Sequence, residues 1–173
     1  MANKITQLVI AICISLALPT AFADQTALQH LRFKTQHDTP VKISSNIRIV
    51  LFAHDMDSKD VIDEMLAGKP EDYLKQHDAI YVANVSGMPR IIARMFAYPA
   101  MREKPYDIWL DESGTQTSDW LQSEGKVTIF QLDSFRIVSS NTTDNIEELN
   151  HILAKTHTEP TPATSIVKAP TAD

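Results

Sequence analysis

Cysteine and glycine are both scarce in this chain of 173 residues. Cysteine occurs once, at Cys13, so the chain cannot close an intramolecular disulfide or offer a metal a set of thiolate ligands. Four glycines argue against a glycine-rich phosphate loop. The sequence also has no serine nucleophile elbow, zinc signature or dinucleotide fingerprint. No cofactor is therefore predicted.

Cations are in the minority. The chain has 16 lysines and arginines against 22 aspartates and glutamates, a formal net charge of −6. Binding to nucleic acid and attraction to anionic membrane surfaces both depend on clustered basic residues, so neither is expected. The apolar fraction of 43% is close to that of globular proteins and allows a packed core.

The first 23 residues have the pattern of a Sec-type signal peptide. Lys4 supplies a positive start, and residues 8–18 form an apolar run that is short for a bilayer span. Pro19 ends this run, and residues 21–23 give a small-x-small cleavage site. Cleavage after Ala23 removes the single cysteine. We expect a periplasmic protein with no membrane insertion after cleavage; an uncleaved membrane anchor is the alternative.

One domain is predicted between two flanking segments. Residues 24–29 read as a polar lead-in and residues 30–155 as the domain. Residues 156–173 are rich in proline, threonine and alanine and lack apolar periodicity, so we expect a disordered tail.

The first half of the domain alternates strands with amphipathic segments. Residues 31–43 predict a β-hairpin and residues 47–53 a strand buried on both faces. A helix then begins at Asp57 or Ser58. Its expected buried stripe consists of Val61, Ile62, Met65 and Leu66.

A second strand and helix follow the first pair. The strand covers residues 79–85, and the helix begins near Pro89 and ends at Pro99. Arg90 and Arg94 are expected on its solvent face. Its expected buried stripe consists of Ile91, Ile92, Met95 and Phe96.

The remaining elements complete an α/β domain. Strands are predicted over residues 106–110, 127–132 and 135–138, the last two joined by a tight turn. A final helix is expected to be capped by Asp144, with Glu147 completing a capping box. This order implies a mixed central sheet in a three-layer α/β/α arrangement.

Several phrases resemble those of the thioredoxin-like fold, over residues 31–153. The segment 31–43 is similar to the N-terminal hairpin of periplasmic thiol oxidoreductases and peroxiredoxins, and Ile49-Val50-Leu51-Phe52-Ala53 to their central strand. Lys104-Pro105 resembles their cis-proline, and residues 86–102 resemble a phrase of a group of small exported proteobacterial proteins. Where the family carries reactive cysteines, this chain has His54-Asp55-Met56-Asp57-Ser58, which implies that thiol redox chemistry is not inherited.

The 54–58 segment is also the candidate site. His54, Asp55, Asp57 and Asp60 follow a central strand, where carboxylates and an imidazole could bind a divalent cation. The alternative is that Asp55 and Asp57 cap a helix. An Asp-x-Asp phosphatase motif is a further, weaker match.

A second group of candidates is basic and aromatic. Arg90, Arg94, Arg102 and Lys104 could form a patch for an acidic partner or an anion, or could simply be solvated. Tyr98 and Met101, if exposed, would add an apolar interaction surface.

Together these observations predict a binding module of the cell envelope. The binding surface is expected between the His54–Ser58 loop and the Pro105 loop, which the resemblance places side by side. An envelope protein or a small ligand is the expected partner. The rival hypothesis is a metal-dependent or hydrolytic enzyme that uses His54, Asp55 and Asp57.

Overall fold

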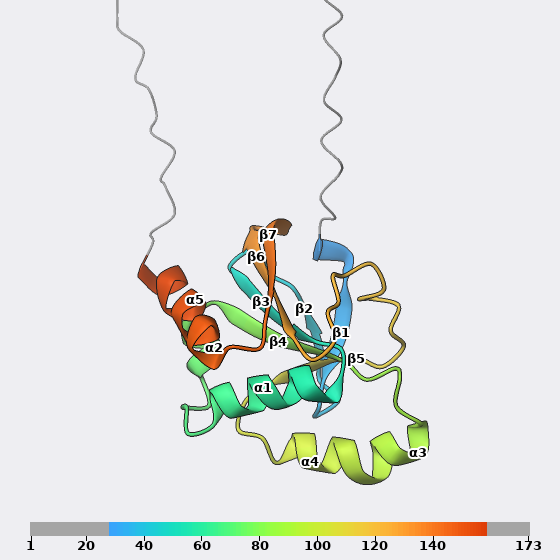
Figure 1. Ribbon diagram of the computed structural model, residues 1–173. Helices are drawn as coiled ribbons and strands as arrows, with labels where there is room; N and C mark the ends of the chain where they lie inside the picture. The colour runs from blue at the N-terminus through green and yellow to red at the C-terminus, as the bar shows by residue number, and fades with distance from the viewer. Residues whose placement is uncertain (1–27, 159–173) are drawn as a thin grey trace, which may run out of the picture.

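A computed structural model describes residues 28–158, which form a seven-stranded mixed sheet with helices packed on it (Figure 1). The spatial order of the strands is β2-β1-β5-β4-β3-β6-β7. The strands are β1 (Arg32–Thr35), β2 (Pro40–Lys42), β3 (Ile49–Ala53), β4 (Ala79–Asn84), β5 (Ile108–Asp111), β6 (Val127–Asp133) and β7 (Arg136–Thr143). The helical elements are η1 (Leu28–His30), α1 (Met56–Leu66), α2 (Tyr73–Gln76), α3 (Arg90–Ile92), η2 (Ala93–Ala97), α4 (Tyr98–Arg102) and α5 (Ile146–Thr158).

The three central strands run parallel to one another. Strand β4 pairs in parallel with β3 on one side and with β5 on the other, while the outer pairs β1–β2, β1–β5, β3–β6 and β6–β7 are antiparallel. All five residues of β3 are buried, as expected of a strand covered on both faces. Since parallel strands end at the same edge, the residues that follow β3, β4 and β5 share one edge of the sheet.

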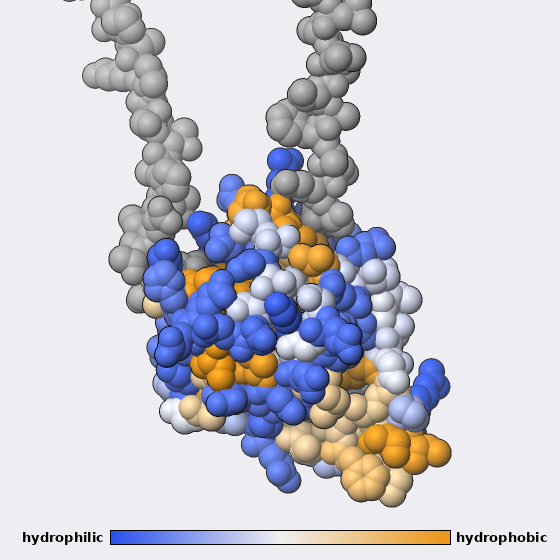
Figure 2. Space-filling model, in the orientation of Figure 1, coloured by the Kyte–Doolittle hydropathy of each residue, from blue (hydrophilic) through white to orange (hydrophobic). Residues whose placement is uncertain are grey.

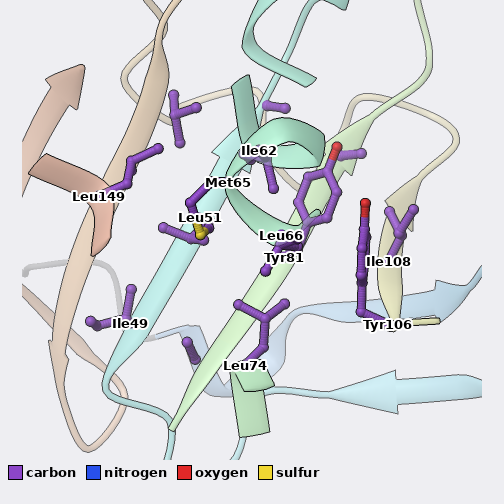
Figure 3. Close-up of a cluster of buried hydrophobic side chains, with 14 of the residues drawn as sticks. Ile49, Leu51, Ile62, Met65, Leu66, Leu74, Tyr81, Tyr106, Ile108 and Leu149 are labelled. Carbon is purple, nitrogen blue, oxygen red and sulfur yellow. The ribbon is translucent and has the colours of Figure 1, made fainter. Parts of the chain in front are cut away.

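The sheet buries a different hydrophobic cluster on each face. On one face, helices α1, α2, α4 and α5 contribute buried side chains to the cluster that Figure 3 shows in part. No α-helix in the described part of the chain contributes a buried side chain to the cluster on the other face. The other face is covered by irregular chain and by the η1 turn, with Trp120 and Leu28 in its cluster. The mixed α/β class is thus confirmed, while the outer layer of the second face is largely irregular within residues 28–158.

The boundaries of the domain lie slightly outside the predicted ones. Leu28 is fully buried and its N–H donates to the carbonyl of Phe135, so the domain begins before residue 30. Helix α5 continues to Thr158, past the predicted end at residue 155. The predicted signal peptide and residues 159–173 of the predicted tail lie outside the described residues.

No helix within residues 28–158 is long and apolar enough to cross a membrane.

The cap of α5 differs from the predicted one. The side chain of Asn145, not Asp144, accepts from the N–H groups of Glu147 and Glu148, at 2.8 and 3.3 Å. Glu148 turns back to accept from Thr143 and Asn141. An amide oxygen serves as well as a carboxylate in capping, so residue type alone could not choose between the two neighbours.

The segment 90–102 also departs from the prediction, because Pro99 does not end its helix. The chain passes through the π-helical stretch η2 and continues to Arg102, and the N–H of Tyr98 donates to the carbonyl of Ala93. A proline inside an α-helix leaves the carbonyl four residues earlier without its donor and clashes with it. The wider π turn just before Pro99 is the kind of irregularity that accommodates such a residue.

Candidate functional site

A cavity of about 420 Å³ lies at the edge of the sheet where β3 and β4 end. Its walls come from the start of α1, the loop that follows β4, and α4. The predicted His54–Ser58 segment therefore borders a real hollow. The lining residues are Ala53, His54, Asp55, Met56, Lys59, Ala83, Asn84, Val85, Gly87, Met88, Pro89 and Met101.

Asp55 is the N-cap of α1. Its Oδ1 accepts from the N–H of Ser58 and its Oδ2 from the N–H of Gly125, each at 2.8 Å. Burial raises the pKa of Asp55, but hydrogen bonds from Ser58 and Gly125 and the nearby His54 outweigh it, so the pKa lies below its ordinary value. Of the two predicted roles, capping is the one that the structure shows for Asp55; Asp57 lies in the first turn.

His54 occupies the cavity wall in an unusual state. Its side chain is 15% exposed, and its Nε2 lies 3.3 Å from Oδ2 of Asp55. Within residues 28–158, its buried Nδ1 has no hydrogen-bond partner. A buried ring nitrogen without a partner is uncommon and calls for an explanation.

The predicted divalent-metal candidates do not form a ligand set. Both carboxylate oxygens of Asp55 are used by backbone N–H groups, and Asp60 pairs with Lys59. In the described part of the chain, no three His, Cys, Asp or Glu side chains gather around a possible ion position. Within residues 28–158, His54, Asp55 and Asp57 therefore do not form the carboxylate–imidazole ligand set that the metal-dependent alternative predicted.

The predicted basic patch is divided by ion pairs. Arg102 donates to Asp38 at 2.9 Å and to the carbonyl of Gln36 at 2.8 Å. Lys104 lies 2.7 Å from Asp63, and the hydroxyl of Tyr98 donates to Glu112. Arg90 and Arg94 are exposed, and neither forms an ion pair with any residue in the 28–158 range.

Asp63 is the centre of a polar cluster that the sequence did not reveal. Its carboxylate accepts from Lys59 at 3.0 Å and from the hydroxyl of Tyr106 at 2.8 Å, in addition to its pair with Lys104. Burial raises the pKa of Asp63, but the hydrogen bonds from these donors lower it by more. The pKa of Asp63 is therefore below its ordinary value. The cluster ties α1 to the chain between α4 and β5.

Pro105 does not lie beside the His54 loop. It lines a different cavity, of about 690 Å³, together with Asn46 and Asp78 at the opposite edge of the sheet. The reason is topological: Pro105 precedes a strand parallel to β3, whereas His54 follows β3. The loop that does reach the His54 segment carries Gly125. No peptide bond among residues 28–158 is cis, so Pro105 is trans.

Asp111, a buried carboxylate, was missed by sequence reasoning. It lies at the end of β5 with 2% exposure. It accepts from Ser113, from the N–H of Gly114 and from both donors of Thr117. The Asp-x-Ser-Gly phrase at 111–114 is typical of such a turn and was the available signal.

The apolar stripe predicted to be buried in the second helix faces solvent instead. Ile91, Ile92, Met95 and Phe96 are 70, 45, 63 and 63% exposed, and we call these four residues the exposed stripe. Figure 2 shows apolar side chains gathered over this part of the molecule. The buried residues of the segment are Ala93 and Met101, eight positions apart on the opposite side.

No family model and no curated protein matches the sequence. Among solved structures, the chain is similar to the exposed lipoprotein thioredoxin of Streptococcus pneumoniae, with 11% identity, a TM-score of 0.50, and coverage of 72% of this chain and 98% of the other. The chain has a thioredoxin-like fold. A thioredoxin-like protein of Porphyromonas gingivalis aligns at 16% identity and a TM-score of 0.47, over 74% of this chain and 90% of that one.

The thioredoxin-like fold is thus present without the family's cysteine pair. The single cysteine of the sequence is residue 13, and the segment after the central strand β3 contains none. At these identities the similarity is one of fold and not of activity.

Proposed function

We propose that this protein is an exported, thioredoxin-like binding module with no thiol redox activity, which docks on a protein partner through the exposed stripe. The observation that carries the proposal is the exposure of four large apolar side chains on one helical segment. Export rests on the N-terminal sequence pattern alone.

The exposed stripe is not needed for the fold. The segment is already attached to the body through Ala93 and Met101, which are 4 and 3% exposed. Contiguous apolar side chains on a protein surface favour aggregation unless a partner covers them, so such patches commonly mark interaction sites. An amphipathic helix that presents apolar anchors one turn apart is a recurrent way of filling a hydrophobic groove.

The charges around the exposed stripe indicate which residues surround the groove of the partner. Between Asp78 and Glu103 the chain carries three arginines and no carboxylate, although the protein as a whole is acidic. Two of these arginines, Arg90 and Arg94, flank the exposed stripe without an ion pair to any described residue. The partner is therefore a protein with an apolar groove and an acidic rim, since opposite charges at the rim favour encounter and orientation.

Site-specific photo-crosslinking tests this proposal. A photoreactive amino acid replaces Phe96 in one variant and Val138 in another, because Val138 is 54% exposed but lies on β7, away from the stripe. In intact cells, position 96 is expected to yield a discrete heterologous adduct and position 138 none. The purified partner should then bind the protein directly, with an affinity that Phe96→Ser lowers by at least about tenfold and Val138→Ser leaves unchanged.

Three outcomes contradict the proposal. The first is an equal pattern of adducts at positions 96 and 138. The second is an adduct at position 96 with the mass of two copies of this chain, which would make the stripe a self-association surface. The third is a crosslink to lipid without any protein, which would make it a membrane contact.

A further inference from the structure

Three methionines line the cavity beside His54. Met56 comes from the start of α1, Met88 from the loop after β4 and Met101 from α4. These are half of the six methionines in the sequence, and they are 13 or more residues apart along the chain. Only the fold brings these three residues to the wall of one 420 Å³ hollow.

His54 adds a nitrogen donor to the same wall. Its Nε2 lies 3.3 Å from Oδ2 of Asp55. Its Nδ1 is buried and has no hydrogen-bond partner within residues 28–158, so in the neutral tautomer with the proton on Nε2 the lone pair of Nδ1 would be free to bind a metal. A carboxylate on one ring nitrogen and a metal on the other is the common arrangement of a histidine ligand.

These donors are selective for soft cations. Thioether sulfur is a weak ligand for Zn²⁺, Mg²⁺ or Ca²⁺ but suits Cu(I). We propose that the cavity binds Cu(I), with the sulfur atoms of Met56, Met88 and Met101 and Nδ1 of His54 as the ligands.

The surrounding charges are compatible with a monovalent cation. Asp55 places a carboxylate next to the imidazole, and the three thioethers carry no charge. The ammonium of Lys59, which also lines the cavity, is offset by Asp60 and Asp63, each at 3.0 Å. Met56 is half exposed and Met101 buried, so the ion would enter from the α1 side. This site is distinct from the exposed stripe and does not depend on the proposed docking function.

Anaerobic titration with Cu(I) against a chromophoric chelator tests the site. The protein and all its variants begin at Asp24, after the predicted cleavage site, so that no thiol competes. We expect about one equivalent of Cu(I), with the affinity reduced about 10- to 100-fold in Met88→Leu and in Met101→Leu. Leucine conserves the volume of methionine, so these variants should fold, which their urea unfolding curves will show.

The chain offers two matched controls. Met65 is buried in the core on α1 and Met95 is exposed on η2, and neither lines the cavity. Met65→Leu and Met95→Leu should bind Cu(I) as tightly as the parent protein. In an NMR titration with Ag(I), a redox-inert soft analogue, the methyl resonances of Met56, Met88 and Met101 should shift, and those of Met65 and Met95 should not.

Two results would overturn the inference. One is binding of less than roughly a fifth of an equivalent of Cu(I) by the folded parent protein. The other is equal loss of affinity in the control variants, or methyl shifts that do not single out the three cavity methionines.

Discussion

Helix α1 and the segment α3–α4 have large apolar residues at the same spacing. Helix α1 buries most of these residues, whereas the segment α3–α4 exposes them. Ile62, Met65 and Leu66 of α1 are at most 2% exposed. The exposed stripe repeats the positions of the α1 stripe thirty residues later, yet its members are 45% exposed or more. The periodicity therefore predicts that a helix has an apolar side. It does not predict that this side packs on the sheet.

The difference lies in what each helix offers on its other side. The side of α1 away from the core carries charged residues such as Asp60, which can face only water. The segment α3–α4 has a second apolar side, of small or flexible residues, which allows its backbone to approach the sheet. Ala93 and Met101 take that role, and the larger residues are left for a partner.

Truncation of one isoleucine in each stripe should give the largest contrast. Ile62→Ala is expected to lower the free energy of unfolding by about 2–5 kcal/mol, because it leaves a cavity in a fully buried position. Ile91→Ala should change it by no more than about 0.5 kcal/mol. Urea denaturation of both variants measures this, and similar losses would mean that the exposed stripe is packed after all.

Enlarging the small side of α3–α4 should have the next largest effect. Ala93→Leu is expected to cost about 1–3 kcal/mol, since the added side chain must displace a closely packed neighbour. Ala100→Leu, at an exposed position of the same segment, is the control and should be close to neutral. Thermal unfolding of both variants gives the answer. Equal stability of the two would contradict the assignment of the buried side.

Removal of the α1 cap should cost less. Asp55→Ala takes away acceptors for Ser58 and Gly125 and should destabilise the protein by about 1–2 kcal/mol. Asp57 lies two residues later, in the first turn of the helix. Asp57→Ala should lower the stability by only about 0.5 kcal/mol, because it removes a favourable interaction with the helix dipole. Chemical denaturation at neutral pH compares them. A larger loss in the Asp57 variant would reverse their roles.

The smallest expected effect is a change in how stability depends on pH in acid. The pKa of Asp63 is lower in the folded protein than in the unfolded chain, so its ion pairs stabilise the fold above the unfolded value, about 3.9, and are lost as the pH falls through the folded value. Asp63→Asn should therefore flatten the decline of stability below about pH 4. Asp60→Asn, at an exposed position, should retain the slope. Parallel pH profiles for parent and Asp63→Asn would exclude this role.

Sequence reasoning gave the succession of strands and helices along the chain and the apolar stripe of α1, because each depends on local pattern. It placed the start of α1 at Asp57 or Ser58 and left capping by Asp55 as one of two roles, whereas the helix begins at Met56 with Asp55 as its cap. It failed for Pro105, since the edge of the sheet on which a residue lies follows from strand direction, and β5 runs parallel to β3. It failed for the exposed stripe because two apolar sides competed within one segment. The methionine-lined cavity could not be foreseen, because its residues meet only after the chain has folded.

Hydroxyl-radical labelling of the protein in intact cells and after purification tests the central claim most directly. If a partner covers the exposed stripe, labelling of Met95 and Phe96 relative to Val138 will be high in the purified protein and several-fold lower in cells. The same relative labelling in both preparations would show that the stripe faces solvent where the protein works, and the account of this surface as a docking site would be wrong.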